Sequence, residues 1–459
     1  MATQLKSAVV AALAAVATVQ AACPAGLPPK NGAPVVAPGF QARLIANGLS
    51  KPRGLVVDSA GHLLAVTNGA GITSFTLNTD AAGCVTVASK NVIASQAGMN
   101  HGIDLSADGK TLFASTISVV YAFPYDAATA KAGTPKTVVS GMTSADHTSR
   151  TIWASKKVPN MILVSRGSSS NTDAGAASVS AGRSQIRAFD ITKGGAQDYT
   201  TGGKLIAYGV RNSVGVTEHP VTGGIWSVEN SVDDLARGGK DIHQDNPGEE
   251  MNYHGYLNGT ASPMQGKSYG FPGCYAAWKV VDLPNNQQIK VGTHFSPTAS
   301  DANCATAIPP RLTFPAHWAP IDIKFNTKGT TAYVTSRGSW NRRQPDGYML
   351  YAIEFNANGE PTHPATSNTA VIPIVSNKNN AACPRGCFRP TGLAWDAQGH
   401  LYMASDSTGE IYVITKTDGS GIDDVQPKSS GATPPTLSRF TLDEPSWPRV
   451  GDEQRGRED

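Results

Sequence analysis

Six copies of one residue pattern recur along this 459-residue chain, and this repetition limits the possible folds more than any other feature. Each copy has a Gly or small residue, an apolar alternating strand, a polar turn and a second apolar strand. The copies begin at Arg53, His101, Arg150, Val214, Ile321 and Thr391. Five turns contain a glycine, which tolerates the positive φ of tight hairpins: Gly61, Gly109, Gly223, Gly329 and Gly399. The pattern therefore predicts six β-hairpins.

The spacing of the copies favours a ring of blades. The Gly-equivalent positions 54, 102, 151, 215, 322 and 392 are separated by 48, 49, 64, 107 and 70 residues. The first two intervals match a propeller blade of about 40 to 50 residues. The longer intervals indicate loop insertions, the longest around residues 233–317. Because six hairpins suffice to close a ring, we expect an all-β, six-bladed β-propeller. Two stacked β-sandwiches are the alternative.

Composition agrees with an all-β chain and limits its partners. Only 16% of the residues are charged, while glycine and proline number 47 and 30. Lys and Arg exceed Asp and Glu by three, which is too little for a polyanion track, so we expect no nucleic-acid partner. Length alone suggests two or three domains of about 150 residues each, but a closed ring holds most of the chain in one.

The N-terminus is typical of a secretory signal peptide. Lys6 supplies the positive charge, an apolar run follows, and Val19-Gln20-Ala21 fits the small-x-small cleavage rule. The run is shorter than the roughly 20 apolar residues that span a bilayer, so an uncleaved anchor is the weaker alternative and we expect no membrane association. We predict secretion and three segments: a signal peptide over residues 1–21, a propeller over residues 22–418 and a disordered tail over residues 419–459.

Six cysteines in a secreted chain suggest three disulfides, for which 15 pairings are possible. We expect the pairs Cys274–Cys304 and Cys383–Cys387, because each closes a short loop. This leaves Cys23 to pair with Cys84. A zinc site is the rival, but only one pair of cysteines is close in sequence and no histidine lies nearby. The sequon Asn258-Gly259-Thr260 predicts a glycosylation site in a Gly-rich loop.

Residues just before the six inner strands face one mouth of the expected channel. They are Arg53, His101, Arg150, Arg211, Pro320 and Arg389. Four arginines and a histidine in phase with the repeat predict a cationic well, rather than scattered surface charges. Arginine forks bind carboxylates through two parallel hydrogen bonds, so the well favours a small polyanion.

Seven short motifs at the blade starts and ends resemble those of the soluble quinoprotein sugar dehydrogenases. The motifs are Asp146-His-Thr-Ser-Arg150, Arg211-Asn-Ser-Val-Gly215, Trp226-Ser-Val-Glu-Asn-Ser231, Asn246-Pro-Gly-Glu-Glu-Met-Asn252, Tyr269-Gly-Phe-Pro272, Arg337-Gly-Ser-Trp-Asn341 and Phe388-Arg-Pro-Thr-Gly392. The chain is most similar to the fungal secreted branch, the pyrroloquinoline-quinone-dependent pyranose dehydrogenases of auxiliary activity family twelve. This resemblance covers residues 27–415. It implies pyrroloquinoline quinone (PQQ) and Ca²⁺ as cofactors.

The resemblance also assigns a general base. His147 matches the histidine that takes the proton of the anomeric hydroxyl while hydride moves to the quinone, and Asp146 would orient it. His101 also opens a blade and is the rival base. His219 and His317 fit a structural role, as histidines that cap strands.

Four further residues match cofactor-binding positions of the family. Arg211 and Asn212 match the pair beside the quinone oxygens. Arg337 takes the place of a cofactor-binding lysine, and Arg389 matches a cofactor arginine after the last crossover. Two weaker candidates for the same role are Arg53 and Arg342.

Calcium would bridge the quinone edge to two backbone carbonyls, and the resemblance places these at Ser231 and Val232. The bacterial relatives have Gly-Pro where this chain has Ser-Val. The neighbouring acids could bind a metal, support the loop or be solvated, and we expect the last two together: Asp233, Asp234, Glu249 and Glu250. A stacking wall for a sugar ring, or ordinary blade-edge packing, is expected of Tyr253, Tyr256, Tyr269, Phe271 and Trp340.

The favoured function is a secreted quinoprotein oxidoreductase that oxidises pyranoses, or related osones, at the anomeric carbon. Electrons would pass to a diffusible acceptor other than oxygen or to a separate protein, such as a lytic polysaccharide monooxygenase. The alternatives are a calcium-dependent lactonase-type hydrolase, which needs carboxylate or Asn ligands converging on the channel axis, and a propeller that only binds sugars or proteins.

Overall fold

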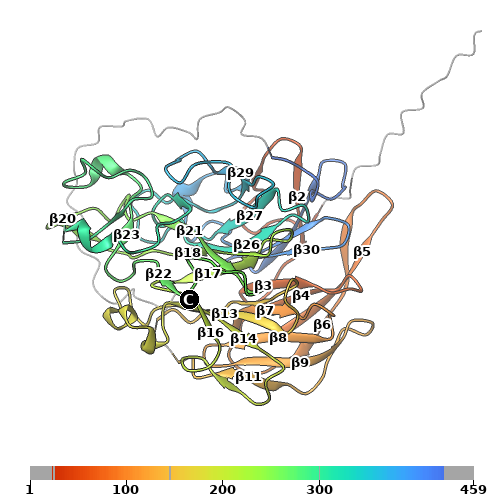
Figure 1. Cartoon of the computed structure of the whole chain (residues 1–459). Helices are drawn as coiled ribbons and strands as arrows, with labels where there is room; N and C mark the ends of the chain where they lie inside the picture. Colours follow the sequence, from red (N-terminus) through yellow and green to blue (C-terminus); the bar gives the residue numbers. More distant parts are fainter. Residues whose placement is uncertain (1–22, 24–25, 144–145, 299, 428–459) are drawn as a thin grey trace, which may run out of the picture.

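The computed structural model describes residues 23, 26–143, 146–298 and 300–427 and shows six antiparallel sheets arranged in a ring (Figure 1). Each sheet is one blade, numbered here along the chain. Blade 1 contains β3 (Pro52–Val57), β4 (Leu63–Thr67), β5 (Gly71–Thr79) and β6 (Val85–Ala94). Blade 2 contains β7 (Met99–Leu105), β8 (Thr111–Thr116), β9 (Val120–Asp126) and β11 (Lys136–Ser140). Blade 3 contains β12 (Ile152–Ala154), β13 (Met161–Arg166), β14 (Gln185–Asp190) and β16 (Lys204–Tyr208).

The remaining three blades repeat this order. Blade 4 contains β17 (Ser213–Glu218), β18 (Gly224–Glu229), β21 (Glu249–Tyr256) and β25 (Leu312–Phe314). Blade 5 contains β26 (Pro320–Phe325), β27 (Thr331–Ser336), β28 (Met349–Glu354) and β29 (Ile372–Ser376). Blade 6 contains β30 (Pro390–Trp395), β31 (Leu401–Ser405), β32 (Glu410–Lys416) and β2 (Phe40–Ala46). Short strands extend blades 5, 2 and 3: β1 (Val35–Val36), β10 (Lys131–Ala132), β15 (Gln197–Asp198) and β22 (Lys267–Ser268).

Helical structure is limited to short 3₁₀ segments: η1 (Ala174–Ala177), η2 (Val179–Ala181), η3 (Val280–Asp282), η4 (Asp301–Cys304) and η5 (Asn380–Ala382). Among the described residues, no helix has the length and apolar character that a membrane crossing requires.

The ring closes through the N-terminal strand. β2 pairs antiparallel with β32, so the two ends of the propeller share blade 6. The inner strands contact one another in the order β3, β7, β12, β17, β26 and β30, and β30 contacts β3 again. Backbone hydrogen bonds therefore hold the seam, and the six-bladed propeller predicted from the repeat is confirmed.

Glycines in the inner strands allow neighbouring blades to approach closely at the channel. A Cβ added to Gly54 would lie 2.1 Å from the carbonyl oxygen of His101, and one added to Gly392 would lie 2.0 Å from that of Arg53. No side chain fits at these distances, so another residue would push the inner strands apart. In the hairpins glycine has its other use, since the five predicted turn glycines all have positive φ: Gly61, Gly109, Gly223, Gly329 and Gly399.

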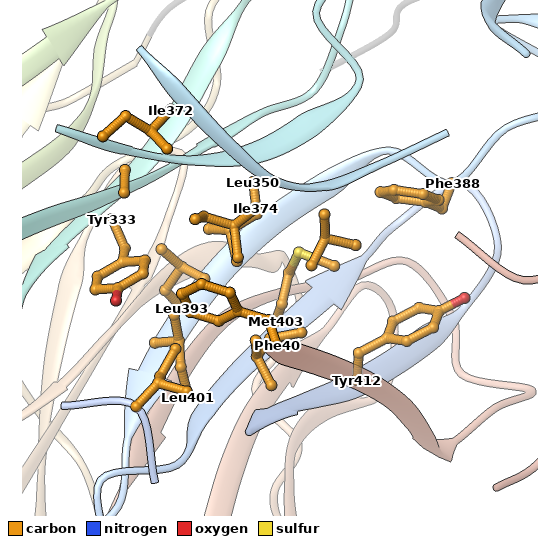
Figure 2. Close-up of a cluster of buried hydrophobic side chains, with 14 of the residues drawn as sticks. Phe40, Tyr333, Leu350, Ile372, Ile374, Phe388, Leu393, Leu401, Met403 and Tyr412 are labelled. Atoms are coloured by element: carbon orange, nitrogen blue, oxygen red, sulfur yellow. The ribbon is translucent and has the colours of Figure 1, made fainter. Parts of the chain in front are cut away.

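Apolar clusters fill the spaces between neighbouring blades. Figure 2 shows the one between blades 5 and 6, where Tyr333 and Leu350 meet Leu393 and Leu401. All four side chains are fully buried. Burial of such a side chain contributes roughly 1.5–3 kcal/mol, so the blades are held mainly by their mutual contacts.

The longest interval between repeats forms an insertion beside blade 4. It contains two small hairpins, β19 (Ala236–Arg237) with β20 (Lys240–Asp241) and β23 (Tyr275–Ala276) with β24 (His294–Phe295). Figure 1 shows β20 and β23 outside the ring. The insertion has its own apolar cluster, and the buried Arg237 makes two contacts of 2.8 Å with Asp301. It is therefore a packed substructure that stands beside the channel mouth.

The three predicted disulfides, Cys23–Cys84, Cys274–Cys304 and Cys383–Cys387, are all present. The predicted tail boundary needs correction. Ile422 is buried in the core between blades 5 and 6, and Asp423 accepts a hydrogen bond of 2.6 Å from the backbone N–H of Thr327. The packed structure therefore extends to residue 427. The predicted signal peptide and the rest of the predicted tail lie outside the described residues.

Candidate active site

A cavity of about 1020 Å³ opens at one mouth of the channel. Five inner strands, β3, β7, β17, β26 and β30, each have a register shift at their start. Such bulges re-aim side chains, and the cavity lies at these strand starts. Its charged lining residues are Arg53, Asp146, His147, Arg211, Asp233, Asp234, Glu249, His317, Arg337, Arg385 and Arg389.

The wall formed by blades 5, 6 and 1 is rich in arginine, and we call it the arginine wall. Its centre is the buried Asp406, whose Oδ2 accepts hydrogen bonds from Arg53 at 3.0 Å and from Arg337 at 2.9 Å. Arg389 donates through Nε to the carbonyl of Arg337 at 3.0 Å. Burial alone raises the pKa of Asp406, but Arg337, Arg53 and Arg389 outweigh burial and hold that pKa below its usual value. The wall thus holds three guanidiniums around one ionised carboxylate among the described residues.

Blades 3 and 4 and the insertion form the opposite wall. In this wall, hydrogen-bond acceptors surround Arg211. We call it the acidic wall. Arg211 donates to the carbonyl of Ser231 at 2.6 Å and to the side-chain oxygen of Asn171 at 2.8 Å, and its terminal nitrogen lies 3.4 Å from Asp233. Asn171 also accepts from the backbone N–H of Asp233 at 2.9 Å. The charge of Arg211 is therefore balanced within the wall.

His317 adds a second cation to the acidic wall. Its Nδ1 lies 3.2 Å from Asp233, and its Nε2 lies 2.6 Å from the carbonyl of His243. Both acceptors require a ring N–H, so the ring is an imidazolium. Burial lowers the pKa of His317, but Asp233 and Glu249 outweigh it and raise that pKa above its usual value. The backbone of His317 has a φ of 64°, an uncommon conformation for a residue with a side chain.

Buried carboxyls support the acidic wall from below. Glu249 accepts hydrogen bonds from the backbone N–H groups of Ser231 at 2.6 Å and Ala319 at 3.1 Å, yet burial raises its pKa to about 7. Glu229 accepts from the backbone N–H of Arg211 at 2.5 Å. Burial and the neighbouring Glu250 raise the pKa of Glu229 well above its usual value. The prediction that Glu249 and Glu250 are solvated is wrong, because both are buried; they support the loops, as the other half of that prediction expected.

His147 lines the cavity, and its ring is in the neutral form that can accept a proton. Its Nδ1 is 3.1 Å from the carbonyl of Ser168, so Nδ1 carries the proton and Nε2 is the acceptor. Burial, with Arg211 adding to it, lowers the pKa of His147 to about 3. Asp146 Oδ2 lies 4.0 Å from Nδ1. Ser168 therefore orients the ring, where the sequence predicted Asp146.

Most of the residues predicted for the site lie together on the cavity: His147, Arg211, Asn212, Ser231, Arg337 and Arg389. His101 does not line it. This rival base is buried behind Arg53, from whose Nε it accepts a hydrogen bond of 3.2 Å. Arg150 is also fully buried and donates to backbone carbonyls, including that of His147 at 2.8 Å. The predicted cationic well is thus only one side of the cavity.

The two predicted calcium ligands are backbone carbonyls, and that of Ser231 accepts a hydrogen bond from Arg211. The positive charge of Arg211 opposes a metal ion at the same oxygen, so the arrangement does not fit calcium at Ser231. The side chain of Val232 packs in the apolar cluster of the insertion, and its carbonyl stays a predicted ligand. No group of three or more His, Cys, Asp or Glu side chains suited to a metal occurs in the described residues.

Sequence reasoning missed or misplaced several lining residues. His317 was expected to be structural but lies on the cavity. His219 is structural as expected, since its Nε2 lies 2.9 Å from the carbonyl of Gly329. Trp340 is the one predicted aromatic on the cavity lining. The other four pack elsewhere, Tyr253, Tyr256 and Tyr269 around the core of blade 4 and Phe271 in the insertion.

Comparisons with known proteins show which chains this one is similar to. A family model described as TrAA12-like matches residues 34–417. A pyrroloquinoline quinone-dependent sugar dehydrogenase of Hypocrea jecorina is 46% identical over 402 residues, which cover 85% of this chain and 91% of that protein. The calcium structure of the Trichoderma reesei member of Carbohydrate-Active Enzymes Family AA12 aligns with a TM-score of 0.81 at 46% identity, covering 84% of this chain and 97% of that one. The holo form of the pyranose dehydrogenase PQQ domain of Coprinopsis cinerea aligns with a TM-score of 0.80 at 36% identity, covering 86% and 99%.

Together, the propeller, the cavity at its channel mouth and these relatives define an oxidoreductase of the β-propeller class. Since the family model covers most of the chain, the protein belongs to the TrAA12-like family. The family resemblance inferred from the seven motifs is thereby confirmed.

Proposed function

We propose that this chain binds PQQ in the cavity and oxidises a pyranose sugar, or a related osone, at its anomeric carbon. The names of its relatives support quinoprotein sugar oxidation. The site supports the finer statement, because it combines an anion-binding wall with a neutral histidine in one cavity.

The residues present fit the three carboxylates of PQQ. Arg53, Arg337 and Arg389 gather on one wall, and arginine forks are suited to planar carboxylates. When bound, PQQ supplies the acceptor for the two electrons removed from the sugar. These three arginines would hold it and keep its charge compensated away from bulk water.

His147 carries the proposal. Oxidation to a lactone removes the anomeric C–H as hydride and the O–H as a proton, and a carbonyl forms between the same carbon and oxygen. Nε2 of His147 is the proton acceptor, since Nδ1 already donates to Ser168. Because burial lowers the pKa of His147, the ring is neutral and its Nε2 carries no proton, as the role of general base requires.

Arg211 and Asn212 complete the proposed set as partners of the quinone oxygens. Arg211 reaches the cavity while its charge is held by Asn171, Ser231 and Asp233. No calcium step is part of this proposal, because Arg211 occupies the carbonyl of Ser231.

We extend the proposal to the surroundings of the protein. The signal-like N-terminus supports secretion, and the exposed Asn258 is accessible for glycosylation. Electrons would then leave for a diffusible acceptor other than oxygen or for a second secreted redox enzyme, such as a lytic polysaccharide monooxygenase. No observation favours the lactonase alternative, since Asp233, an acidic residue of the cavity, is paired with Arg211 and His317.

Titration of the apoprotein with PQQ, followed by tryptophan quenching, tests the first half of the proposal. We expect binding in the micromolar range or tighter, about 8 kcal/mol or more. The Arg337→Gln variant should bind more weakly, because it removes a cation from the arginine wall. Absence of binding by the wild type would refute the cofactor assignment.

Reduction of a redox dye by the loaded protein tests the second half. His147→Ala should bind PQQ normally but reduce the dye about 10²–10⁴-fold more slowly, because general-base catalysis is lost. His363→Ala, which changes a histidine outside the cavity, is the matched control and should keep full activity. Full activity in His147→Ala would remove that residue from the role of base.

A further inference from the structure

The rim of the cavity presents a tryptophan to solvent. Trp340 lines the cavity and is 59% exposed, whereas Trp226 and Trp318 are buried. An aromatic ring of this size in water is costly, and such rings at the edge of a cavity are typical of binding surfaces.

The loop that carries Trp340 is firmly held, so its exposure does not result from a loose segment. Asn341 donates to Asp234 at 2.8 Å on one side of the ring. On the other side, Ser339 and Asp346 exchange two hydrogen bonds of 2.9 Å. Because the flanking residues are fixed, the ring is presented to a ligand at little entropic cost.

A second loop brings a cation to the same rim. Arg385 lines the cavity and is exposed. It lies between Cys383 and Cys387, whose disulfide closes the loop, and the backbone N–H of Gly386 donates to the carbonyl of Ala382 at 2.8 Å. Within the described residues, its guanidinium has neither a hydrogen-bond partner nor an ion pair.

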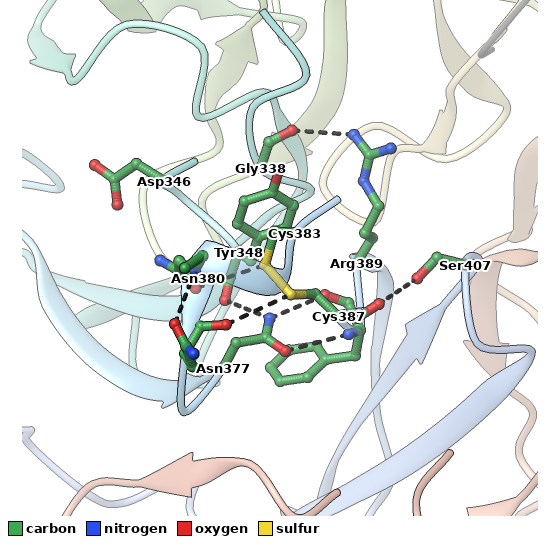
Figure 3. The surroundings of a disulfide bond; sticks show 12 residues. Gly338, Asp346, Tyr348, Asn377, Asn380, Cys383, Cys387, Arg389 and Ser407 are labelled. Carbon is green, nitrogen blue, oxygen red and sulfur yellow. Dashed lines mark hydrogen bonds between the residues drawn. A yellow bond between two sulfur atoms is a disulfide. The ribbon is translucent and has the colours of Figure 1, made fainter. Parts of the chain in front are cut away.

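Tyr348 connects the two loops (Figure 3). Its ring packs against Cys383 and Cys387, and its hydroxyl donates to the carbonyl of Ser339, the residue before Trp340. The glycine that precedes Ser339, Gly338, has a φ of 84°, and a Cβ there would lie 2.3 Å from the Tyr348 ring. The loops that carry Trp340 and Arg385 are therefore joined in one packed unit.

We propose that Trp340 and Arg385 form a rim subsite for a sugar ring that bears a carboxylate, that is, a uronic acid unit. The apolar face of the pyranose would stack on the indole, and the carboxylate would pair with the guanidinium. This inference rests on the proposed function, because the uronic acid unit would be linked to the sugar that is oxidised deeper in the cavity.

Burial distinguishes Arg385 from the cations assigned to the cofactor. Arg53 and Arg389 are buried at 5% and 3% exposure, while Arg385 stands in solvent. A solvent-exposed ion pair is weak, so Arg385 would select among ligands while Trp340 supplies most of the affinity.

Calorimetric titration of the PQQ-loaded protein, without an electron acceptor, tests the subsite. The probes are a disaccharide with a glucuronic acid unit linked to glucose, its neutral counterpart with two glucose units, and gluconate as a carboxylate without a ring. We expect the acidic disaccharide to bind tightest and gluconate weakest. Trp340→Ala should weaken both disaccharides about tenfold, or about 1.4 kcal/mol, and Trp340→Tyr should restore much of this loss.

Arg385→Gln should weaken only the acidic disaccharide, by about two- to fivefold, and raised salt should remove this difference. Arg343→Gln changes an exposed arginine outside the cavity lining and should have no effect. Equal affinity of wild type for the two disaccharides would overturn the proposal, as would a loss of PQQ affinity in Arg385→Gln. Normal PQQ binding with no disaccharide binding would overturn the subsite alone and leave the cofactor assignment standing.

Discussion

The two walls of the cavity handle their charges in opposite ways. In the arginine wall, Arg53 and Arg337 share the single carboxylate of Asp406, and Arg389 donates to a backbone carbonyl beside them. In the acidic wall, Arg211 alone is surrounded by acceptors of the loops from blades 3 and 4. The first wall is therefore suited to an incoming anion, while the second is a hydrogen-bonded framework that already balances itself.

The difference follows from where the walls come from. Arg53 and Arg389 stand at blade starts in phase with the repeat. The acidic wall depends on the insertion and on a long loop of blade 3, since Asn171 reaches across to residue 233. The repeat places charged side chains at the channel mouth, whereas the insertion and the long loop supply the groups that balance the charge of Arg211.

Removal of Asp406 should have the largest effect on the free energy of unfolding and should separate the two walls most clearly. Asp406→Ala leaves two guanidiniums without their shared carboxylate in a buried setting, so we expect a loss of about 3–5 kcal/mol in the free energy of unfolding. Asp233→Ala should cost less, about 1–3 kcal/mol, because Arg211 keeps its carbonyl acceptors and His317, unlike an arginine, can release its second proton. Urea denaturation of both variants measures the difference, and equal losses would contradict the distinction between the walls.

Much of the arginine wall was predictable from the sequence, because its residues follow from signals that lie close together in the chain. Hairpin turns and inner strands are encoded by glycines and apolar alternation within about 20 residues, so the blade starts could be counted. Arg53 and Arg389 follow from those starts, and Arg337 follows from a family motif. No local signal shows which of the arginines has a carboxylate partner, since Asp406 is 353 residues from Arg53.

The acidic wall was predicted poorly because its contacts are long-range. His317 becomes a cation only through Asp233 and the carbonyl of His243, which are 84 and 74 residues away. Its place three residues before the blade start at Pro320 was the available signal. The sequence also showed no sign that the side chain of Val232 packs in the apolar core of the insertion.

The second largest difference between the two walls should be in how their contribution to stability depends on pH. Glu249 has a pKa raised from 4.5 to about 7 by burial, so the folded state binds more protons between these values. Stability is then lost as the pH rises through this window, by up to about 3 kcal/mol. His317 has the same sign, because its raised pKa gives stability at acidic pH that is lost above that pKa.

The contribution of the arginine wall to stability should change at acidic pH instead. The lowered pKa of Asp406 contributes stability above pH 3.8 that is lost as the pH falls below it. We therefore expect a stability maximum at mildly acidic pH in urea unfolding measured from pH 3 to 9. Glu249→Gln should flatten the alkaline limb and leave the acid limb unchanged. An unchanged alkaline limb in that variant would show that Glu249 does not titrate there.

The smallest expected effect concerns Asn171, which sets the position of Arg211 without a charge of its own. Its backbone carbonyl accepts from Arg211 at 3.0 Å, its side-chain oxygen accepts from Arg211 and from the N–H of Asp233, and its amide donates to the carbonyl of Asp233 at 2.8 Å. Asn171→Ala removes the side-chain contacts but keeps the backbone one. We expect PQQ affinity to fall about tenfold, equal to 1.4 kcal/mol, with a loss of stability of about 1 kcal/mol.

Asn171→Asp distinguishes positioning from general support of the loop. The aspartate keeps an acceptor for Arg211 and loses the donor to the Asp233 carbonyl, so affinity for PQQ should stay closer to wild type than in Asn171→Ala, while stability falls at least as much. Fluorescence titration and urea unfolding of the same two variants give both values. If affinity and stability instead fall in parallel, Asn171 only holds the loops of blades 3 and 4 together. The acidic wall would then have no share in binding beyond Arg211 itself.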